Sequence, residues 1–184
     1  MPYRESPADR CGDLPCRSAG AYGWKNAEVN VRDATAGDIP ELVRLREILA
    51  DRMARDGHLP IEEEWQRAYA ESLQERLGSS DTAVYVVDSP DRGLAACGIG
   101  LIFDRFPGPS LPDGRYGYVQ GMTTDPRHRR RGHGRMIMGA LLEWYRDSGV
   151  RRVDLHATSD AEPLYRQFGF VDDGYPSLTW RDHS

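Results

Sequence analysis

Residues 118–135 constrain the fold of this chain more than any other segment. They begin as a strand-like stretch, pass through Asp125-Pro126 into an arginine-rich turn with two glycines, and run into an amphipathic helix. That helix is expected to reach about Asp147 and to stop at Gly149, and residues 150–158 have the pattern of another strand. A strand, a helix and a second strand in this order predict a parallel strand pair joined by a helical crossover.

The segments before that crossover predict an antiparallel part of the same sheet. Residues 82–88 and 94–104 are rich in Val, Ile and Leu, and the turn-forming residues 89–93 separate them, as in a hairpin. A further strand is expected over residues 116–124 and a short one over residues 29–31. The tail of the chain is expected to supply one or two closing strands.

Helices are expected where apolar residues recur at helical spacing. The first begins at Thr35 and Asp38, which have capping-box spacing, and ends at Gly57. A second helix fits residues 61–77, and a short one fits residues 161–168. The predicted fold is therefore α/β (α+β), with a single mixed, mostly antiparallel central sheet and helices on both faces.

The length of the chain supports one domain. A folded protein of 184 residues buries roughly 70% of the surface of its unfolded chain, which is enough for one core. Residues 1–28 have no hydrophobic period and carry several prolines and glycines, so a flexible N-terminal leader is expected there. Residues 29–184 are expected to form the single domain.

Charge and hydropathy exclude several classes of function. The net charge of −5 argues against general nucleic-acid binding, so no nucleic-acid partner is expected. The longest apolar stretch, residues 94–103, is too short to span a membrane and is interrupted by Gly98 and Gly100. The first twenty residues contain no apolar signal-peptide core, so the expected location is the cytoplasm.

The three cysteines predict neither a disulfide framework nor a metal site. Cys11 and Cys16 lie in the polar leader, and no neighbouring Cys-His pair completes a zinc-binding set. Cys97 lies inside an apolar run, where a free thiol packs as a small hydrophobic side chain.

The basic turn has the chemistry of a pyrophosphate cradle. Backbone N–H groups at a helix N-terminus favour negative charge, and Gly132 and Gly134 let a ligand approach the backbone. The surrounding cationic donors are Arg127, Arg129, Arg130, Arg131 and Arg135. His128 and His133 in the same turn are expected to face phosphate or solvent. The alternative interpretation of the turn is a solvated charge cluster or a nucleic-acid patch.

Three ordered motifs resemble the GNAT N-acetyltransferase superfamily. Arg129-x-x-Gly132-x-Gly134 matches its Arg/Gln-x-x-Gly-x-Gly/Ala signature. Downstream, Ala161-Glu-Pro-Leu-Tyr165-Arg-Gln-Phe-Gly169-Phe170 resembles the family's Ala-x-x-Leu-Tyr-x-x-x-Gly-Phe segment. Upstream, residues 31–43 resemble its first strand and helix. The resemblance spans roughly residues 29–180.

The resemblance implies that acetyl-CoA, as cosubstrate, binds across a splayed pair of parallel strands. Met122 and Thr124 occupy the positions that contact the pantetheine arm, and the amides of residues 130–135 hold the pyrophosphate. The implied coenzyme-binding residues are Met122, Thr124, Arg129, Arg130, Arg131, Gly132, His133, Gly134 and Arg135. Tyr165 matches the tyrosine that protonates the departing thiolate, which suits a neutral phenol. Thr158 stands where many members carry Asn, so the sequence departs from the family's pattern at that position.

The implied function is transfer of an acetyl group to the primary amine of a small molecule, by direct attack through a tetrahedral intermediate. Candidate acceptor-binding residues are Trp65, Tyr118, Gln120 and His156, although Trp65 also fits the core and His156 also fits a packed histidine. Two alternatives stay open: a noncatalytic acyl-CoA-binding sensor, and an acyltransferase with another donor such as an acyl-tRNA, against which the net charge counts. A homodimer is also left open.

Overall fold

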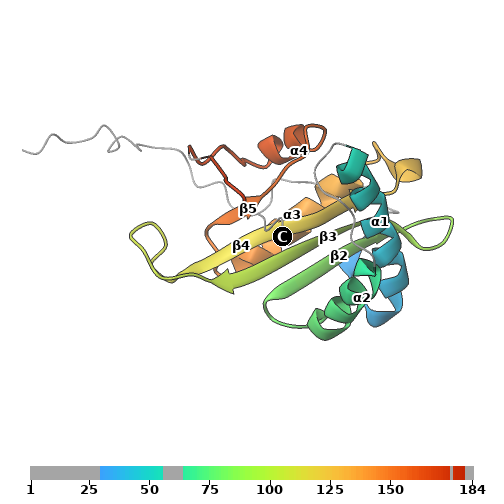
Figure 1. The fold of residues 1–184 in the computed structure, drawn as a ribbon, viewed down its shortest axis with the longest axis horizontal. Helices are drawn as coiled ribbons and strands as arrows, with labels where there is room; N and C mark the ends of the chain where they lie inside the picture. The colour runs from blue at the N-terminus through green and yellow to red at the C-terminus, as the bar shows by residue number, and fades with distance from the viewer. Residues whose placement is uncertain (1–29, 56–63, 175, 181–184) are drawn as a thin grey trace, which may run out of the picture.

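A five-stranded sheet forms the centre of the computed structural model, which describes residues 30–55, 64–174 and 176–180 (Figure 1). The strands lie in the order β1-β2-β3-β4-β5, and all neighbours are antiparallel except the parallel pair β4 and β5. They are β1 (Val31–Asp33), β2 (Thr82–Asp88), β3 (Leu94–Asp104), β4 (Arg115–Thr124) and β5 (Val153–Leu155). The predicted mixed, mostly antiparallel sheet is confirmed.

Helices cover both faces of this sheet, as the sequence predicts. Figure 1 shows α3 passing behind the strands, with α1 and α2 on the near side. The helical segments are η1 (Ala36–Asp38), α1 (Ile39–Arg55), α2 (Trp65–Arg76), η2 (Pro126–His128), α3 (His133–Asp147) and α4 (Glu162–Gln167), the two η segments being 3-10 turns. The predicted capping box is present, because Thr35 N–H donates to the Asp38 carboxylate over 2.7 Å. In the part of the chain that the structure describes, no helix has the length and apolar character needed to cross a membrane.

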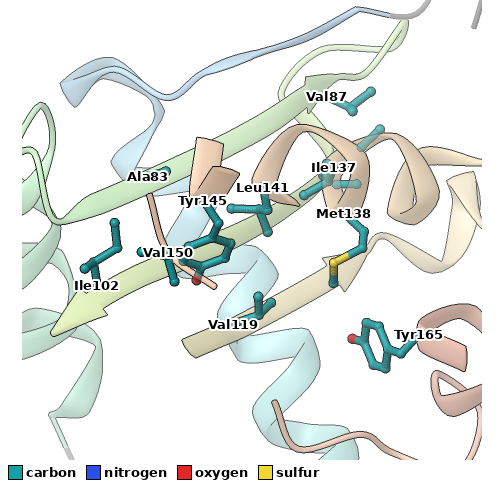
Figure 2. Packing of buried hydrophobic residues seen from close by; sticks show 12 residues of the cluster. Ala83, Val87, Ile102, Val119, Ile137, Met138, Leu141, Tyr145, Val150 and Tyr165 are labelled. Atoms are coloured by element: carbon teal, nitrogen blue, oxygen red, sulfur yellow. The ribbon is translucent and has the colours of Figure 1, made fainter. Parts of the chain in front are cut away.

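Strand alternation divides the core into two clusters, one on each face of the sheet. Along β2, Val84 and Val86 face α1 and α2, whereas Ala83 and Val87 face α3. The cluster under α1 and α2 comprises Leu42, Leu45, Leu73, Val84, Val86, Leu94, Cys97 and Ile99. The cluster under α3, drawn in Figure 2, comprises Ala83, Val87, Ala95, Ala96, Ile102, Val119, Ile137, Met138, Leu141, Tyr145, Val150 and Tyr165.

Two glycines of β3 allow α3 to pack closely on the sheet. A Cβ atom on Gly98 would lie 2.4 Å from Met122 Sδ and 2.6 Å from Ile137 Cγ2. A Cβ atom on Gly100 would lie 2.9 Å from Leu141 Cδ2. These glycines therefore fix the distance between the sheet and the helix whose N-terminus carries the basic turn.

The structure corrects several predicted boundaries. The strand expected over residues 150–158 contracts to β5, because the backbone leaves β4 after Leu155. The expected closing strands are absent from residues 171–174 and 176–180, whose exposed side chains offer no buried face to a sheet. The helix expected over residues 61–77 runs from Trp65 to Arg76 in the described residues, whereas residues 1–28 and Gly57 lie outside them.

Candidate functional site

The parallel strands β4 and β5 form a fork. They pair over three positions, the last of which joins Val119 to Leu155, and they separate beyond that point. A cavity of about 600 Å³ opens in the fork, between α1 on one side and α4 on the other. Its lining comprises Ile48, Leu49, Arg52, Met122, Thr123, Thr124, Arg129, Arg130, Gly132, His133, Gly134, Arg135, Thr158, Asp160, Ala161, Leu164 and Tyr165. We call this the fork cavity, and it agrees with the predicted splayed strand pair.

A bulge in β4 brings its final residues to this cavity. Cys97 of β3 pairs with Thr123 and Ile99 pairs with Gln120, so β4 carries one residue more than β3 between these pairs. Gly121 lies in the bulge with φ of 66°, a left-handed conformation that favours glycine. After this irregularity Met122 and Thr124, two of the predicted coenzyme contacts, both line the fork cavity.

The turn between β4 and α3 lines the cavity and leads directly into a helix N-terminus. Arg130 and Gly132 have φ of 63° and 85°, and α3 starts at His133 directly afterwards. Left-handed residues in such a turn gather successive N–H groups into a concave anion site, and the helix adds the positive end of its dipole. The local backbone therefore fits a phosphate or pyrophosphate group.

Gly134 leaves room above the start of α3. A Cβ atom there would lie 3.4 Å from Leu164 Cδ2 and 4.0 Å from Thr124 Oγ1, across the fork cavity. A larger side chain would extend into the space between these two groups. Eight of the nine predicted coenzyme-binding residues line this cavity, and the ninth, Arg131, is exposed and lies outside its lining.

Two histidines of the turn are buried. His128 is 2% exposed and its Nε2 lies 3.0 Å from Ser89 Oγ, so it does not face solvent as the sequence suggested. His133 is 5% exposed and lines the fork cavity, and burial lowers its pKa below the ordinary value for histidine. The Nδ1 atoms of both rings are buried and have no hydrogen-bond partner among the described residues. His133 is therefore a buried imidazole in the lining of the cavity that the predicted coenzyme would fill.

Tyr165 lies on α4 at the inner end of the fork cavity. Figure 2 shows its ring reaching toward the core, with the hydroxyl on the side where Val119 and Met138 lie. The residue is 6% exposed, and its ring meets Phe170 edge to face at 6.0 Å between centroids. Burial raises the pKa of Tyr165 to about 12, so the hydroxyl keeps its proton at neutral pH. This is the protonation state that a general acid needs.

A network of charged groups attaches α1 to the basic turn. Asp125, which is 2% exposed, accepts hydrogen bonds from Arg44 (2.7 Å) on α1 and from Arg127 (2.9 Å) in the turn. Arg44 also bonds Glu41 and the carbonyl of Leu94 on β3, each over 2.9 Å. Sequence reasoning missed this network, because no local pattern links residues on α1 to a carboxylate about eighty positions away.

The α1 side of the fork cavity was also missed. Ile48 and Leu49 line it, although their spacing indicated only a buried helix stripe. Arg52, one turn further, forms an ion pair with Asp160 from the segment between β5 and α4. The pair connects the two sides of the cavity at residues that both belong to its lining.

A second cavity of about 900 Å³ meets the first at Tyr165, which lines both. We call it the outer cavity, and its walls are aromatic and charged. They comprise Phe103, Arg105, Tyr116, Tyr118, Arg152, Val153, Asp154, Leu155, His156, Ala157, Glu162, Tyr165, Arg166, Phe170, Val171, Asp172, Asp173, Pro176 and Ser177. Ion pairs join Arg152 to Asp154 and Asp173, and Arg166 to Glu162 and Asp172.

The predicted acceptor residues do not all come together. Tyr118 and His156 line the outer cavity and face each other, with 2.6 Å between the Tyr118 hydroxyl oxygen and His156 Nδ1. Gln120 is exposed on β4 and lines neither cavity. Trp65 packs its ring 6.0 Å from that of Tyr69 at the start of α2, away from both linings. The structure therefore assembles two of the four candidates.

The part of the chain that forms the fork cavity is also the part that resembles known proteins. The sequence model described as "Acetyltransferase (GNAT) family" matches residues 43–170, which include the basic turn and Tyr165. "Glucosamine 6-phosphate N-acetyltransferase 1" of Oryza sativa subsp. japonica is 31% identical over 113 residues. That match covers 61% of this chain and spans 66% of the length of the rice protein.

Solved structures share the fold at low sequence identity. A predicted acetyltransferase with acetyl-CoA from Clostridium acetobutylicum superposes with a TM-score of 0.69 and 22% identity, covering 83% of this chain and 96% of that one. Glucosamine-6-phosphate N-acetyltransferase from Arabidopsis thaliana gives a TM-score of 0.65 and 16% identity, covering 84% and 99%. The fold built from the elements above is therefore the fold of these proteins.

Proposed function

The chain belongs to the GNAT acetyltransferase family, and on that premise we propose that it moves an acetyl group from acetyl-CoA to the primary amine of a small molecule. The observation that supports the proposal is the position of Tyr165, the residue that lines both the fork cavity and the outer cavity. A donor in one cavity and an acceptor in the other would meet at this side chain.

The residues of the fork cavity fit acetyl-CoA. The N–H groups of the turn and of the start of α3 offer an anion site for the pyrophosphate, with Arg129, Arg130 and Arg135 beside it. Beyond Val119, no strand of the described residues pairs with β4 on its β5 side, so its backbone there can contact an extended arm. Acetyl-CoA would supply an acetyl thioester, a carbonyl activated toward amines.

In the proposed reaction, the residues of this chain orient the donor, limit water and donate a proton. The cradle and β4 hold the donor in one orientation, which replaces a chance encounter with a fixed geometry. The apolar wall of the fork cavity, including Met122 and Leu164, limits water around the reacting groups. Tyr165, protonated at neutral pH, gives its proton to the sulfur as the thiolate leaves.

The outer cavity supports a small amine as acceptor. Four carboxylates line it (Asp154, Glu162, Asp172 and Asp173) together with three arginines (Arg105, Arg152 and Arg166). Carboxylates attract an ammonium group, while the guanidinium groups of the arginines beside them can bind an anionic substituent. An amino sugar phosphate carries both charges, and the name of the rice relative makes glucosamine 6-phosphate the first acceptor to test.

The test is release of free CoA thiol from acetyl-CoA with a panel of amines, together with calorimetry of CoA binding. We expect binding, and continuous thiol release with at least one amine, with the acetylated product identified by mass spectrometry. Binding without turnover across the panel would favour an acyl-CoA sensor. Absence of binding would reject the assignment of the fork cavity.

A further inference from the structure

Tyr118 and His156 form a hydrogen-bonded pair where the fork begins. Tyr118 lies one residue before the last pairing of β4 with β5, and His156 lies one residue beyond it. Their rings are arranged edge to face with 5.9 Å between centroids, and the hydroxyl oxygen lies 2.6 Å from His156 Nδ1. Both residues line the outer cavity together with Tyr165. The pair therefore lines the proposed acceptor site, which Tyr165 shares with the donor site.

We propose that Tyr118 and His156 act as the proton relay that deprotonates the acceptor ammonium group. The proposal rests on the proposed function and supplies its general base. The Tyr118 oxygen takes a proton from the ammonium group while the Tyr118 hydroxyl proton moves to His156 Nδ1. The amine becomes neutral, Tyr118 keeps one proton, and His156 becomes an imidazolium.

The proton balance of acetyl transfer requires such a path. A primary ammonium group that becomes an amide loses two protons. One appears on the thiol of CoA: the N–C bond forms first, and as the tetrahedral intermediate collapses and its C–S bond breaks, Tyr165 gives its proton to the sulfur and takes one from the nitrogen. The other is released as H⁺, and the relay carries it through His156 to solvent. The half-exposed Tyr118 and the exposed His156 connect the cavity to water without opening the fork.

The surroundings favour this direction of transfer. With its proton on Nε2, His156 can donate toward Ser177 Oγ at 3.4 Å and leave Nδ1 to accept from Tyr118. Burial, and secondarily the charge of Asp154, raise the pKa of Tyr118. A free Tyr118 phenolate is therefore disfavoured, and the hydroxyl group has to gain one proton as it loses the other. The charged and titratable groups that share the cavity are Arg105, Tyr116, Arg152, Asp154, Glu162, Tyr165, Arg166, Asp172 and Asp173.

A spectroscopic test needs no acceptor. Long-range ¹H–¹⁵N spectra of protein labelled in histidine report which imidazole nitrogen carries the proton, and His156→Gln identifies the His156 signals. We expect the Nε2-protonated tautomer in the wild type and a mixture of tautomers in Tyr118→Phe. A proton on Nδ1 in the wild type, or an unchanged spectrum in Tyr118→Phe, would overturn the relay whether or not the protein acetylates amines.

A kinetic test uses the amine that gives thiol release. Tyr118→Phe and His156→Gln should each lower kcat by roughly 10²-fold at pH 7, and the deficit should shrink toward tenfold near pH 10, where free amine is abundant. The double variant should lose no more than either single variant, because the two groups act as one unit. CoA affinity should stay the same in all three variants.

The matched control is Tyr85→Phe, which removes a hydroxyl from a half-buried tyrosine on β2 outside both cavities. It should retain wild-type turnover. Losses that are equal at every pH, or that add in the double variant, overturn the relay and leave the proposed function standing. Absence of turnover with every amine overturns the proposed function and the relay together.

Discussion

At the scale of single residues, Tyr165 combines a core position with access to both cavities. Its ring belongs to the apolar cluster under α3, and the same residue lines the fork cavity and the outer cavity. Burial holds the proton on its hydroxyl, and packing against Phe170 fixes the ring. Chemistry and stability at this position can therefore be separated by removing only the oxygen.

Tyr165→Phe should lower the single-turnover rate of acetyl transfer by roughly 10²- to 10⁴-fold, the usual range for loss of one general acid. CoA affinity and melting temperature should change little, because the ring and its contacts remain and the lost interaction belongs to the transition state. Rapid-quench kinetics, calorimetry and thermal melting on the same variant provide the three measurements. A wild-type single-turnover rate would end the case for Tyr165 as the acid.

Gly134→Val should weaken CoA binding by roughly tenfold or more, equal to at least about 1.4 kcal/mol. The valine methyl groups would extend toward Leu164 and Thr124, into the space proposed for the pyrophosphate end of the coenzyme. Gly134→Ala should bind nearly normally, since its Cβ stays in ordinary contact at 3.4 Å. Gly139→Val is the matched control, because it makes the same change in α3 where no atom lies within 4 Å. If calorimetry gave equal CoA affinities for Gly134→Val and Gly139→Val, the assignment of the pyrophosphate site to the start of α3 would be wrong.

At the scale of elements, the carboxylate of Asp125 fixes the position of α1 relative to the basic turn. Arg127 comes from the turn, Arg44 comes from α1, and both donate to the same buried group. Both α1 and the basic turn contribute residues to the lining of the fork cavity. Loss of the Asp125 carboxylate should therefore make both of these parts of the lining more mobile.

Asp125→Asn should reduce the free energy of unfolding by about 2 kcal/mol at pH 7, in the range for hydrogen bonds to charged groups. Arg127, followed by Arg44, holds the pKa of Asp125 well below its ordinary value. The unfolded chain therefore takes up this proton at higher pH than the folded chain does. The stabilisation is complete above the unfolded pKa of about 4 and is lost as the pH falls through the folded value.

Urea denaturation between pH 7 and pH 2 measures this effect. The wild type should lose stability more steeply below about pH 4 than Asp125→Asn does, so the two curves should converge in acid. Asp38→Asn provides a comparison, since Arg32 depresses the pKa of Asp38 in the same way but donates to no residue of the turn in the described structure. Parallel curves for the wild type and Asp125→Asn would show that the network contributes no pH-dependent stability.

The sequence predicted the elements whose signals are local. The strand, turn and helix around residues 118–135 follow from hydrophobic period and glycine positions, and eight of the nine predicted coenzyme residues line one cavity. The length of β5 could not be predicted, because the pattern of residues 150–158 gives no sign of where the backbone leaves β4. The contact of Arg44 with Asp125 and that of Tyr118 with His156 depend on the completed fold, since they join residues distant in the sequence. Gly98 and Gly100 suggested only interruptions of an apolar run, whereas their role is the close approach of α3.

At the scale of the whole molecule, the two core clusters of the described residues draw on a continuous part of the chain. With the side chains packed against them, they extend from Val31 to Phe170. Because residues 1–28 have no hydrophobic period, we propose that residues 29–184 fold independently of them. Deletion of residues 1–28 should shift the melting temperature by no more than one or two degrees, which corresponds to about 1 kcal/mol or less for a domain of this size. A fall of many degrees, measured by calorimetry, would place the domain boundary earlier.

The fork also changes the character of β4 along its length. From Gly117 to Val119, β4 has a neighbouring strand on each side, and beyond Val119 it is an edge strand among the described residues, in the middle of the molecule. Exposed edges are templates for pairing with other chains, so proteins usually cover them. A coenzyme arm in the fork would cover this edge as an added strand does. The apoprotein should therefore aggregate more readily than the loaded protein, and coenzyme occupancy would contribute to colloidal stability as well as to chemistry.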